Sequence, residues 1–361
     1  MTNYRGVAYD TGTNFATGQG ELSRNVWSDA LMQSEIDVIS SDLNCNSVTV
    51  FGTDLDRLTA TATAAVDRGL HVYLQPRLVE GTQQEILDHL AEGARLAESL
   101  RGDGALISFG VGAVQLIFTP GLIEGGFYHE RMANVFADAN HFLLHPTAQV
   151  DPAAAAPLLN EFLGKAAAVA RANFEGEVGY SAAPFEDVDW DPFDFVGIQY
   201  HWTPKPRTRE GHLAFIDGYR KWNKPIRITE YGTATYTGAE QKAFFVWDIA
   251  DRSGEVPTIV DGYVRDEAAQ AGYHRKMLEL FETAGVDGVT VSELIHPTHP
   301  HSPDPRYDLD MASMAVLKTI RDDFSDVNST YRWEKKESFH AIADHYARAV
   351  SGNGTSSARV A

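Results

Sequence analysis

The chain has 361 residues, 43% of them hydrophobic, and its 30 Lys and Arg against 50 Asp and Glu give a formal net charge of −20. A chain of this length and apolar content can bury a large core. The negative charge repels nucleic-acid phosphates and anionic membrane surfaces, which excludes both as expected partners. The start of the chain has neither a basic nor an apolar leader, and no apolar stretch approaches the length of a membrane span. We therefore expect a cytoplasmic protein whose partner is a small molecule, while its oligomeric state is not indicated.

Segments with strand and helix patterns alternate along the whole chain. Short apolar or β-branched runs predict eight strands, over residues 6–9, 47–51, 70–74, 106–111, 177–181, 195–200, 226–230 and 286–294. Apolar residues at three-to-four spacing predict helices between them, over residues 27–43, 55–68, 83–100, 154–173, 213–222 and 267–284. This alternation favours parallel strands with helices outside, and eight units favour a closed (β/α)8 TIM barrel of the α/β class. A doubly wound open sheet is the alternative, but no GxGxxG motif follows the first strand.

The sequence predicts a single barrel domain over residues 1–350. An insert over residues 119–152 follows the fourth strand, and its glycines and a predicted helix over 129–144 are typical of a lid over a barrel mouth. The small, polar residues 351–361 predict a disordered tail.

The catalytic groups of a TIM barrel lie at the C-terminal ends of its strands, so the residues that follow each predicted strand are the candidates for a site. Acids, imidazoles and aromatic rings are abundant there, which is typical of a small-molecule pocket. The candidates for substrate binding are Asp10, Gln75, Arg77, Val114, Gln115, Tyr200, Trp202, Tyr236 and His296. The candidates for catalysis are Glu230, His201, Glu293 and Glu186.

Several candidates also have a purely structural interpretation. Glu293 follows an apolar strand, where a carboxylate is costly to bury unless it is paired or used in catalysis. Glu186 either faces the pocket or caps a turn, and His201 either carries a proton or is a hydrogen-bonded rim residue. Gln75 and Arg77 more often brace neighbouring strands than contact a ligand.

The loop over residues 296–304 contains three histidines and an aspartate, which makes a metal site an alternative. Its prolines and the lack of helical i, i+4 spacing favour a rigid loop instead, so we expect no metal. The sequence has neither a P-loop nor a nucleophile elbow, and nothing in it indicates an organic cofactor.

Five short motifs are spread over the chain, at residues 9–12 (YDTG), 74–77 (LQPR), 185–190 (FEDVDW), 228–232 (ITEYG) and 304–313 (DPRYDLDMAS). Together they resemble a group of actinobacterial proteins, often labelled hypothetical or abortive-infection proteins. That group is similar to the large clan of retaining glycosidases with (β/α)8 barrels. The resemblance covers about residues 4–320.

The resemblance implies that Glu230 lies where these glycosidases keep their nucleophile. It also implies that Val114 replaces the general acid of the fourth strand and that Thr49 replaces an arginine of the second. His201 and Trp202 are further replacements after the sixth strand. Glycosidic hydrolysis normally needs two carboxyl groups, so the resemblance implies a changed reaction. Both losses predict a less positive, partly apolar environment for Glu230, suited to proton transfer rather than to nucleophilic attack.

Three functions remain open. The first is an acid–base enzyme on a repurposed glycosidase-like barrel, a lyase or cyclase that performs elimination, addition or cyclisation on a small molecule such as a secondary metabolite. The second is a retaining glycoside hydrolase with Glu230 as nucleophile and an unusual acid, such as Glu293, Glu186 or Glu124. The third is a non-catalytic sugar-binding pseudoenzyme. We favour the first, since the replacements cluster at the site while ionisable groups remain abundant there.

Overall fold

The central sheet has eight parallel strands in the order β5-β4-β3-β2-β1-β10-β7-β6. The computed structural model describes residues 2–15, 22–102, 104–135, 151–201, 208–254 and 256–353. The strands are β1 (Tyr4–Asp10), β2 (Ser47–Gly52), β3 (His71–Pro76), β4 (Ile107–Ala113), β5 (Glu177–Ser181), β6 (Val196–Gln199), β7 (Ile226–Tyr231) and β10 (Gly288–Val291). All eight predicted strands are confirmed, with small differences at their ends.

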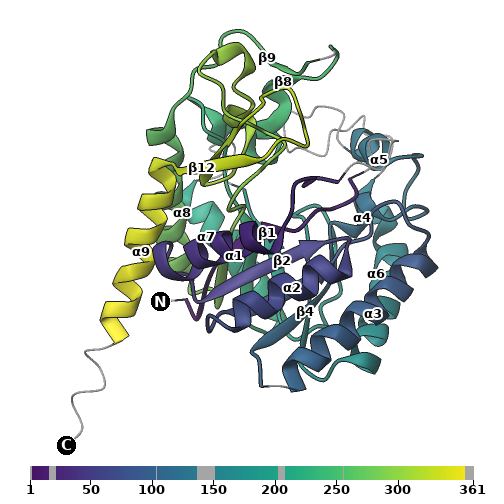
Figure 1. Ribbon diagram of the computed structural model, residues 1–361. Coiled ribbons are helices and arrows are strands. Elements are labelled where there is room, and N and C mark those ends of the chain that lie inside the picture. Colours follow the sequence, from purple (N-terminus) through teal and green to yellow (C-terminus); the bar gives the residue numbers. More distant parts are fainter. Residues whose placement is uncertain are drawn as a thin grey trace, which may run out of the picture.

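The barrel closes between β5 and β6, the two ends of this strand order. Ala182, directly after β5, forms a parallel bridge with Ile198 of β6. The Ala182 N–H donates to the Gly197 carbonyl (2.9 Å), and the Ala182 carbonyl accepts from the Gln199 N–H (2.8 Å). The chain is therefore a (β/α)8 TIM barrel, and the open-sheet alternative is wrong (Figure 1).

Helices surround the barrel (Figure 1). They are α1 (Asp29–Asp37), α2 (Leu55–Val66), α3 (Gln83–Gly102), α4 (Gln115–Phe118), α5 (Tyr128–Val135), α6 (Pro152–Asn173), α7 (Arg209–Asp217), α8 (Glu267–Ala284) and α9 (Glu337–Asn353). Side-chain oxygens of Ser28, Asp54, Asp151, Thr208 and Asp266 accept backbone N–H groups and so begin five of these helices. Shorter turns are the π-helix η1 (Val38–Asp42) and the 3-10 helices η2 (Gly218–Trp222), η3 (Ala239–Ile249), η4 (Pro305–Tyr307) and η5 (Leu309–Ala312).

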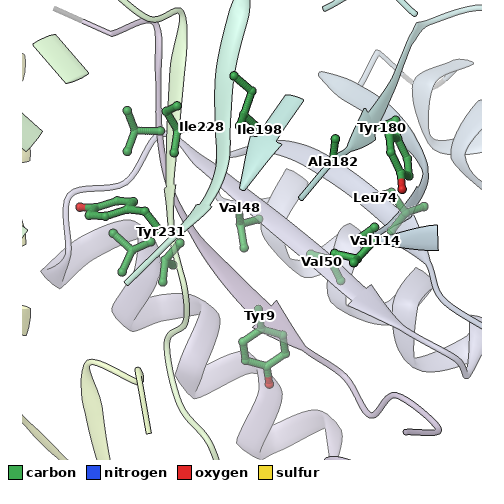
Figure 2. Packing of buried hydrophobic residues seen from close by; sticks show 14 of the residues in the cluster. Tyr9, Val48, Val50, Leu74, Val114, Tyr180, Ala182, Ile198, Ile228 and Tyr231 are labelled. Carbon is green, nitrogen blue, oxygen red and sulfur yellow. The ribbon is translucent and has the colours of Figure 1, made fainter. Parts of the chain in front are cut away.

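The two faces of the strands differ in character. Apolar residues such as Val48, Val50 and Ile228 belong to the core between the strands and the surrounding helices (Figure 2). Small or polar residues alternate with them along the strands. Ser181 and Thr229 are two of these, and their hydroxyl oxygens lie 2.6 Å apart. The apolar layer outside the strands therefore carries most of the hydrophobic packing.

Two hairpins extend from the C-terminal ends of the strands and were not predicted. The pair β8 (Ala250–Asp251) and β9 (Thr258–Ile259) follows β7, and the pair β11 (Leu317–Arg321) and β12 (Tyr331–Lys335) follows β10. Helix α9, also not predicted, packs beside α8 (Figure 1).

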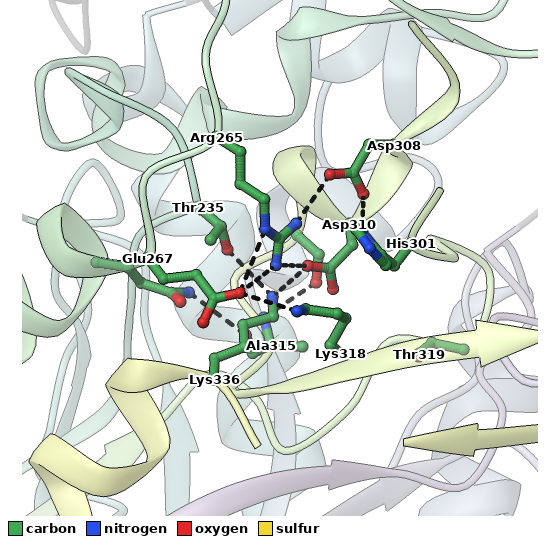
Figure 3. Close-up of polar contacts among 12 residues, drawn as sticks. Thr235, Arg265, Glu267, His301, Asp308, Asp310, Ala315, Lys318, Thr319 and Lys336 are labelled. Carbon is green, nitrogen blue, oxygen red and sulfur yellow. Dashed lines mark hydrogen bonds and ion pairs between the residues drawn. The ribbon is translucent and has the colours of Figure 1, made fainter. Parts of the chain in front are cut away.

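A buried ionic cluster joins these additions to the barrel (Figure 3). Lys336 pairs with Asp310 (2.9 Å), and both side chains are almost fully buried. Arg265 pairs with Asp308 (3.0 Å) and Asp310 (2.9 Å), while Glu267 accepts from Arg265 (2.8 Å). The cluster ties the segment after β7 to the segment after β10.

Two predicted segments, the tail and the lid, lie partly outside the described residues. Helix α9 runs to Asn353, so residues 351–353 of the predicted tail are helical, and residues 354–361 lie outside the described residues. The predicted lid contains α5, but its residues 136–150 also lie outside them. In the described part of the chain, no helix has the length and apolar character needed to cross a membrane.

Gly197 provides a test of barrel closure. A Cβ at this position would lie 2.1 Å from the Tyr180 carbonyl oxygen of the neighbouring strand, whereas a Cβ at Gly164 of α6 would meet nothing within 4 Å. We expect Gly197→Ala to lower the free energy of unfolding by about 2 kcal/mol or more. Gly164→Ala, the matched control, should raise it by up to about 1 kcal/mol. Urea denaturation of both variants measures this, and equal effects would contradict the assigned β5–β6 contact.

Candidate active site

The ends of β6 and β7 bring Glu230, Gln199 and His201 together at the barrel mouth. The β6–β7 register shifts so that Ile198 pairs with Ile228 but Gln199 pairs with Glu230. Such an irregularity re-aims a side chain that simple alternation would place on the other face. The Gln199 Nε2 donates to Glu230 Oε2 (3.2 Å), and the Glu230 side chain is 18% exposed.

His201 presents one ring nitrogen to Glu230. Its Nδ1 lies 3.1 Å from the Gly232 carbonyl oxygen, which can only accept, so Nδ1 carries a proton and donates. Its Nε2 lies 3.8 Å from Glu230 Oε1 and forms no hydrogen bond within the described residues. The His201 side chain is almost fully buried and packs edge-on against Phe244. Because 3.8 Å is too long for a direct hydrogen bond, the two groups face each other across a short gap.

Glu293 and His296 form a second acid–imidazole pair after β10. Glu293 Oε1 lies 2.9 Å from His296 Nδ1, and the peptide bond between Ser292 and Glu293 is cis. The His296 ring packs on His299, whose Nε2 accepts a hydrogen bond from Arg252 (2.7 Å). Burial, together with His296 and Arg252, holds the pKa of His299 well below its usual value. His299 is therefore neutral and acts as an acceptor.

Arg77, which follows β3, brings a positive charge to the mouth. Its guanidinium lies 3.8 Å from the centre of the Phe51 ring and donates to Gln75 Oε1 (2.7 Å). Burial lowers the pKa of Arg77, and the charges of Glu230, Asp10 and Glu293 oppose that change. Arg77 thus supplies positive charge near Glu230, while the expectation of a less positive, partly apolar environment for Glu230 stays a prediction.

Asp10 organises the loop after β1. Its Oδ1 accepts from the Gly12 N–H (2.9 Å) and the Thr13 hydroxyl (3.0 Å), and its Oδ2 accepts from the Ser23 hydroxyl. Burial raises the pKa of Asp10, as does the neighbouring Glu293 charge. Both carboxylate oxygens of Asp10 are therefore used to fix the loop.

The end of β4 carries no carboxylate near the site. Val114 has a left-handed backbone (φ 50°, ψ 46°), and its side chain shares a small cavity with Gln199 and His201. Gln115 folds back, with its Oε1 accepting from the Thr119 hydroxyl (2.5 Å) and its Nε2 donating to the Val111 carbonyl (3.4 Å). Glu124 is exposed. The end of β4 thus places an apolar side chain, Val114, beside His201.

Glu186 caps a turn. Its Oε1 accepts from the Leu116 N–H (3.0 Å) and the Tyr180 hydroxyl (2.8 Å), and its Oε2 accepts from the Ala183 N–H (2.8 Å). Burial raises the pKa of Glu186 to about 7, against the effect of these three hydrogen bonds. The carboxylate joins the ends of β4 and β5, and we assign it no catalytic role.

Two aromatic residues that were predicted to bind substrate, Tyr200 and Tyr236, lie away from the site. The Tyr200 hydroxyl bonds His212 Nδ1 (2.5 Å), and its ring packs against Phe281 of α8. Tyr236 belongs to a separate apolar cluster around η3 and η5 and donates to the Val246 carbonyl (3.1 Å). Tyr200 alternates with its neighbours and therefore faces the helices, so the expectation that these two rings line the site is wrong. Trp202 lies outside the described residues.

Gln199 and Phe244 contact the site but were not predicted as candidates. Period-two alternation with His201 would have placed Gln199 on the same face. Phe244 lies in η3, a segment with no strand-end signal in the sequence. Within the described ranges, no three His, Cys, Asp or Glu side chains converge on a position that could hold a metal ion.

Comparisons with known proteins agree on the fold. No protein-family model matches the sequence, and a search of curated proteins gives no significant match. Among solved structures, a GH113 β-mannanase from Alicyclobacillus acidocaldarius has 14% identity and a TM-score of 0.57, with 96% of this chain and 98% of that chain covered. A β-glycosidase has 12% identity and a TM-score of 0.56, with 96% of each chain covered. A β-glucosidase has 13% identity and a TM-score of 0.55, with 96% and 98% covered. The chain therefore has the fold of glycoside-hydrolase TIM barrels.

The raised pKa of Glu186 predicts a pH-dependent stability. A folded-state pKa of about 7 exceeds the ordinary value of 4.5, so the protonated form favours folding. The contribution of Glu186 is fully present below about pH 4.5 and is lost as the pH rises through 7, by up to about 3 kcal/mol. Relative to wild type, Glu186→Gln should thus gain free energy of unfolding as the pH rises from 4.5 to 8.

Urea denaturation at several pH values measures this difference. Glu161→Gln on the surface of α6 is the control, because Lys165 lowers the pKa of Glu161 below its usual 4.5 and the control should therefore change little over this pH range. A difference between Glu186→Gln and wild type that stays constant with pH would show that Glu186 is ionised throughout.

Proposed function

We propose that this protein is an acid–base enzyme that acts on a small molecule at the C-terminal mouth of the barrel. The observation that carries the proposal is the pairing of His201 Nε2 with Glu230 Oε1 across 3.8 Å, with Nδ1 held by the Gly232 carbonyl. An imidazole changes charge near neutral pH, and a facing carboxylate can hold the proton that the imidazole lacks. A substrate group in the gap can therefore lose a proton to one side chain and gain one from the other.

The surrounding side chains support separate roles for this pair. Glu230 acts as the base, since Gln199 donates to its Oε2 and orients the carboxylate. His201 acts as the acid and gives a proton to the substrate through Nε2. Arg77 offsets the negative charge of the mouth. These roles suit elimination, addition or cyclisation, the chemistry of a lyase or cyclase, and the Glu293–His296 pair is a second source of protons.

A retaining glycoside hydrolase is the second candidate. The structural similarity to glycosidases and the position of Glu230 at the end of β7 favour it. Against it, Val114 occupies the end of β4, and neither Gln115 nor Glu124 brings a carboxyl group there. General acid catalysis contributes about two to four powers of ten, so this candidate requires another acid, such as Glu293.

Substitution of Glu230 separates the two candidates. With a substrate suggested by the neighbouring genes, Glu230→Gln and Glu230→Ala should each lower kcat by about 10²–10⁴, because neither side chain can accept the proton. His201→Gln should have an effect of similar size. Intact-mass spectrometry during turnover should show no covalent adduct. A glycosyl ester on Glu230 would establish the glycosidase instead, and full activity in both Glu230 variants would exclude a catalytic Glu230.

Activated glycosides provide an independent test. A 2,4-dinitrophenyl glycoside needs a nucleophile but no general acid, and a p-nitrophenyl glycoside needs more assistance to its leaving group. We expect the wild type to release no dinitrophenolate from a panel of the former, and Val114→Glu to release no nitrophenol from the latter. Release that disappears in Glu230→Gln would support the glycosidase, since it would show that a sugar site survives.

A further inference from the structure

A small apolar cavity lies beside the Glu230–His201 pair. Ten described residues line it, and eight of them are apolar. The two polar ones are Gln199 and His201, the same two side chains that contact Glu230. The cavity and the proposed proton-transfer pair therefore share a wall.

The cavity walls come from several segments of the chain. Val114 ends β4, Ile117 lies in α4, Met132 in α5 and Phe244 in η3, and Ala183 follows β5. Helices α5 and η3 lie in the segments that follow β4 and β7. Side chains from these loop segments, whose sequences vary more easily than the barrel strands, thus complete the cavity.

We propose that the cavity receives a small hydrocarbon substituent of the substrate, of methyl size, next to the atom at which Glu230 and His201 exchange protons. This assignment rests on the proposed function and names the class of substrate for it. The cavity has a volume of about 20 Å³, close to the room that one water-sized sphere occupies, which limits the size of the group.

Polarity decides against a sugar ring in this position. A hydroxyl buried without a partner costs about 1–3 kcal/mol. A buried methylene gains about 0.8 kcal/mol. The Nδ1 proton of His201 is bonded to the Gly232 carbonyl, the Gln199 amide donates to Glu230, and His201 Nε2 faces Glu230, where the proposed proton transfer uses it. The eight apolar side chains that form the rest of the wall offer a hydroxyl no partner, so the cavity favours a group without hydroxyls.

Methyl NMR of the full chain tests this occupant with ethanol, which carries one methyl group, and with ethylene glycol as its polar counterpart. Ethanol should shift the methyl signals of Val114, Ile117 and Met132 in a saturable way, and ethylene glycol should not. Ala183→Val, which adds two methyl groups to the wall, should weaken the response at least tenfold. Ala154→Val, at an exposed position of α6, is the matched control and should leave it unchanged.

Two further variants keep the test decisive. Val114→Thr keeps the shape of valine but replaces one methyl group by a hydroxyl, so it should also weaken ethanol binding even if Ala183→Val folds poorly. Glu230→Gln should keep the response, since it does not line the cavity. No response in the wild type, an equal response to ethylene glycol, or a full response in both cavity variants overturns the assignment. Turnover by the Glu230 variants is measured separately, so a failure here leaves the proposed function standing, and a failure there leaves the cavity result intact.

Discussion

The register shift between β6 and β7 is the constraint on which the candidate site depends. Thr229 faces the barrel interior, where its hydroxyl meets Ser181, and strict alternation would turn Glu230 toward the helices. The shift pairs Gln199 with Glu230 and lets the carboxylate face the mouth, while Tyr231 still packs against Phe281 of α8. The strand that carries this shift, β6, also closes the barrel through the bridge between Ala182 and Ile198.

The barrel could be predicted from the sequence because its signals are repeated. Eight apolar runs separated by helical patterns leave few other architectures, and each run corresponds to a strand. The hairpins β8–β9 and β11–β12 were missed because they are short and lie in segments rich in charged residues. Their position depends on Arg265, Asp310 and Lys336, which come from distant parts of the sequence and pair only in the folded chain.

The candidate site could be predicted as a set of positions but not as an arrangement. Strand ends correctly indicated Glu230, His201 and Glu293 as neighbours of one mouth, because parallel strands all end there. The direction in which each side chain points was harder to predict from the sequence. Tyr200 faces the helices although His201 faces Glu230, and Glu186 turns into a cap although it follows a strand. Irregular strand pairing and hydrogen bonds to backbone N–H groups decide such cases, and neither has a sequence pattern of its own.

The charges of the molecule fall into two arrangements with different consequences. In the buried cluster of Figure 3, Arg265, Lys336 and their carboxylates are in direct contact at 2.8–3.0 Å, which satisfies each charge and fixes the loops. At the mouth, His201 and Glu230 are held 3.8 Å apart by their other hydrogen bonds. The first arrangement is complete within the protein, whereas the second leaves His201 Nε2 without a hydrogen-bond partner among the described residues. A buried polar atom without a partner calls for an explanation, and the proposed acid–base function supplies one.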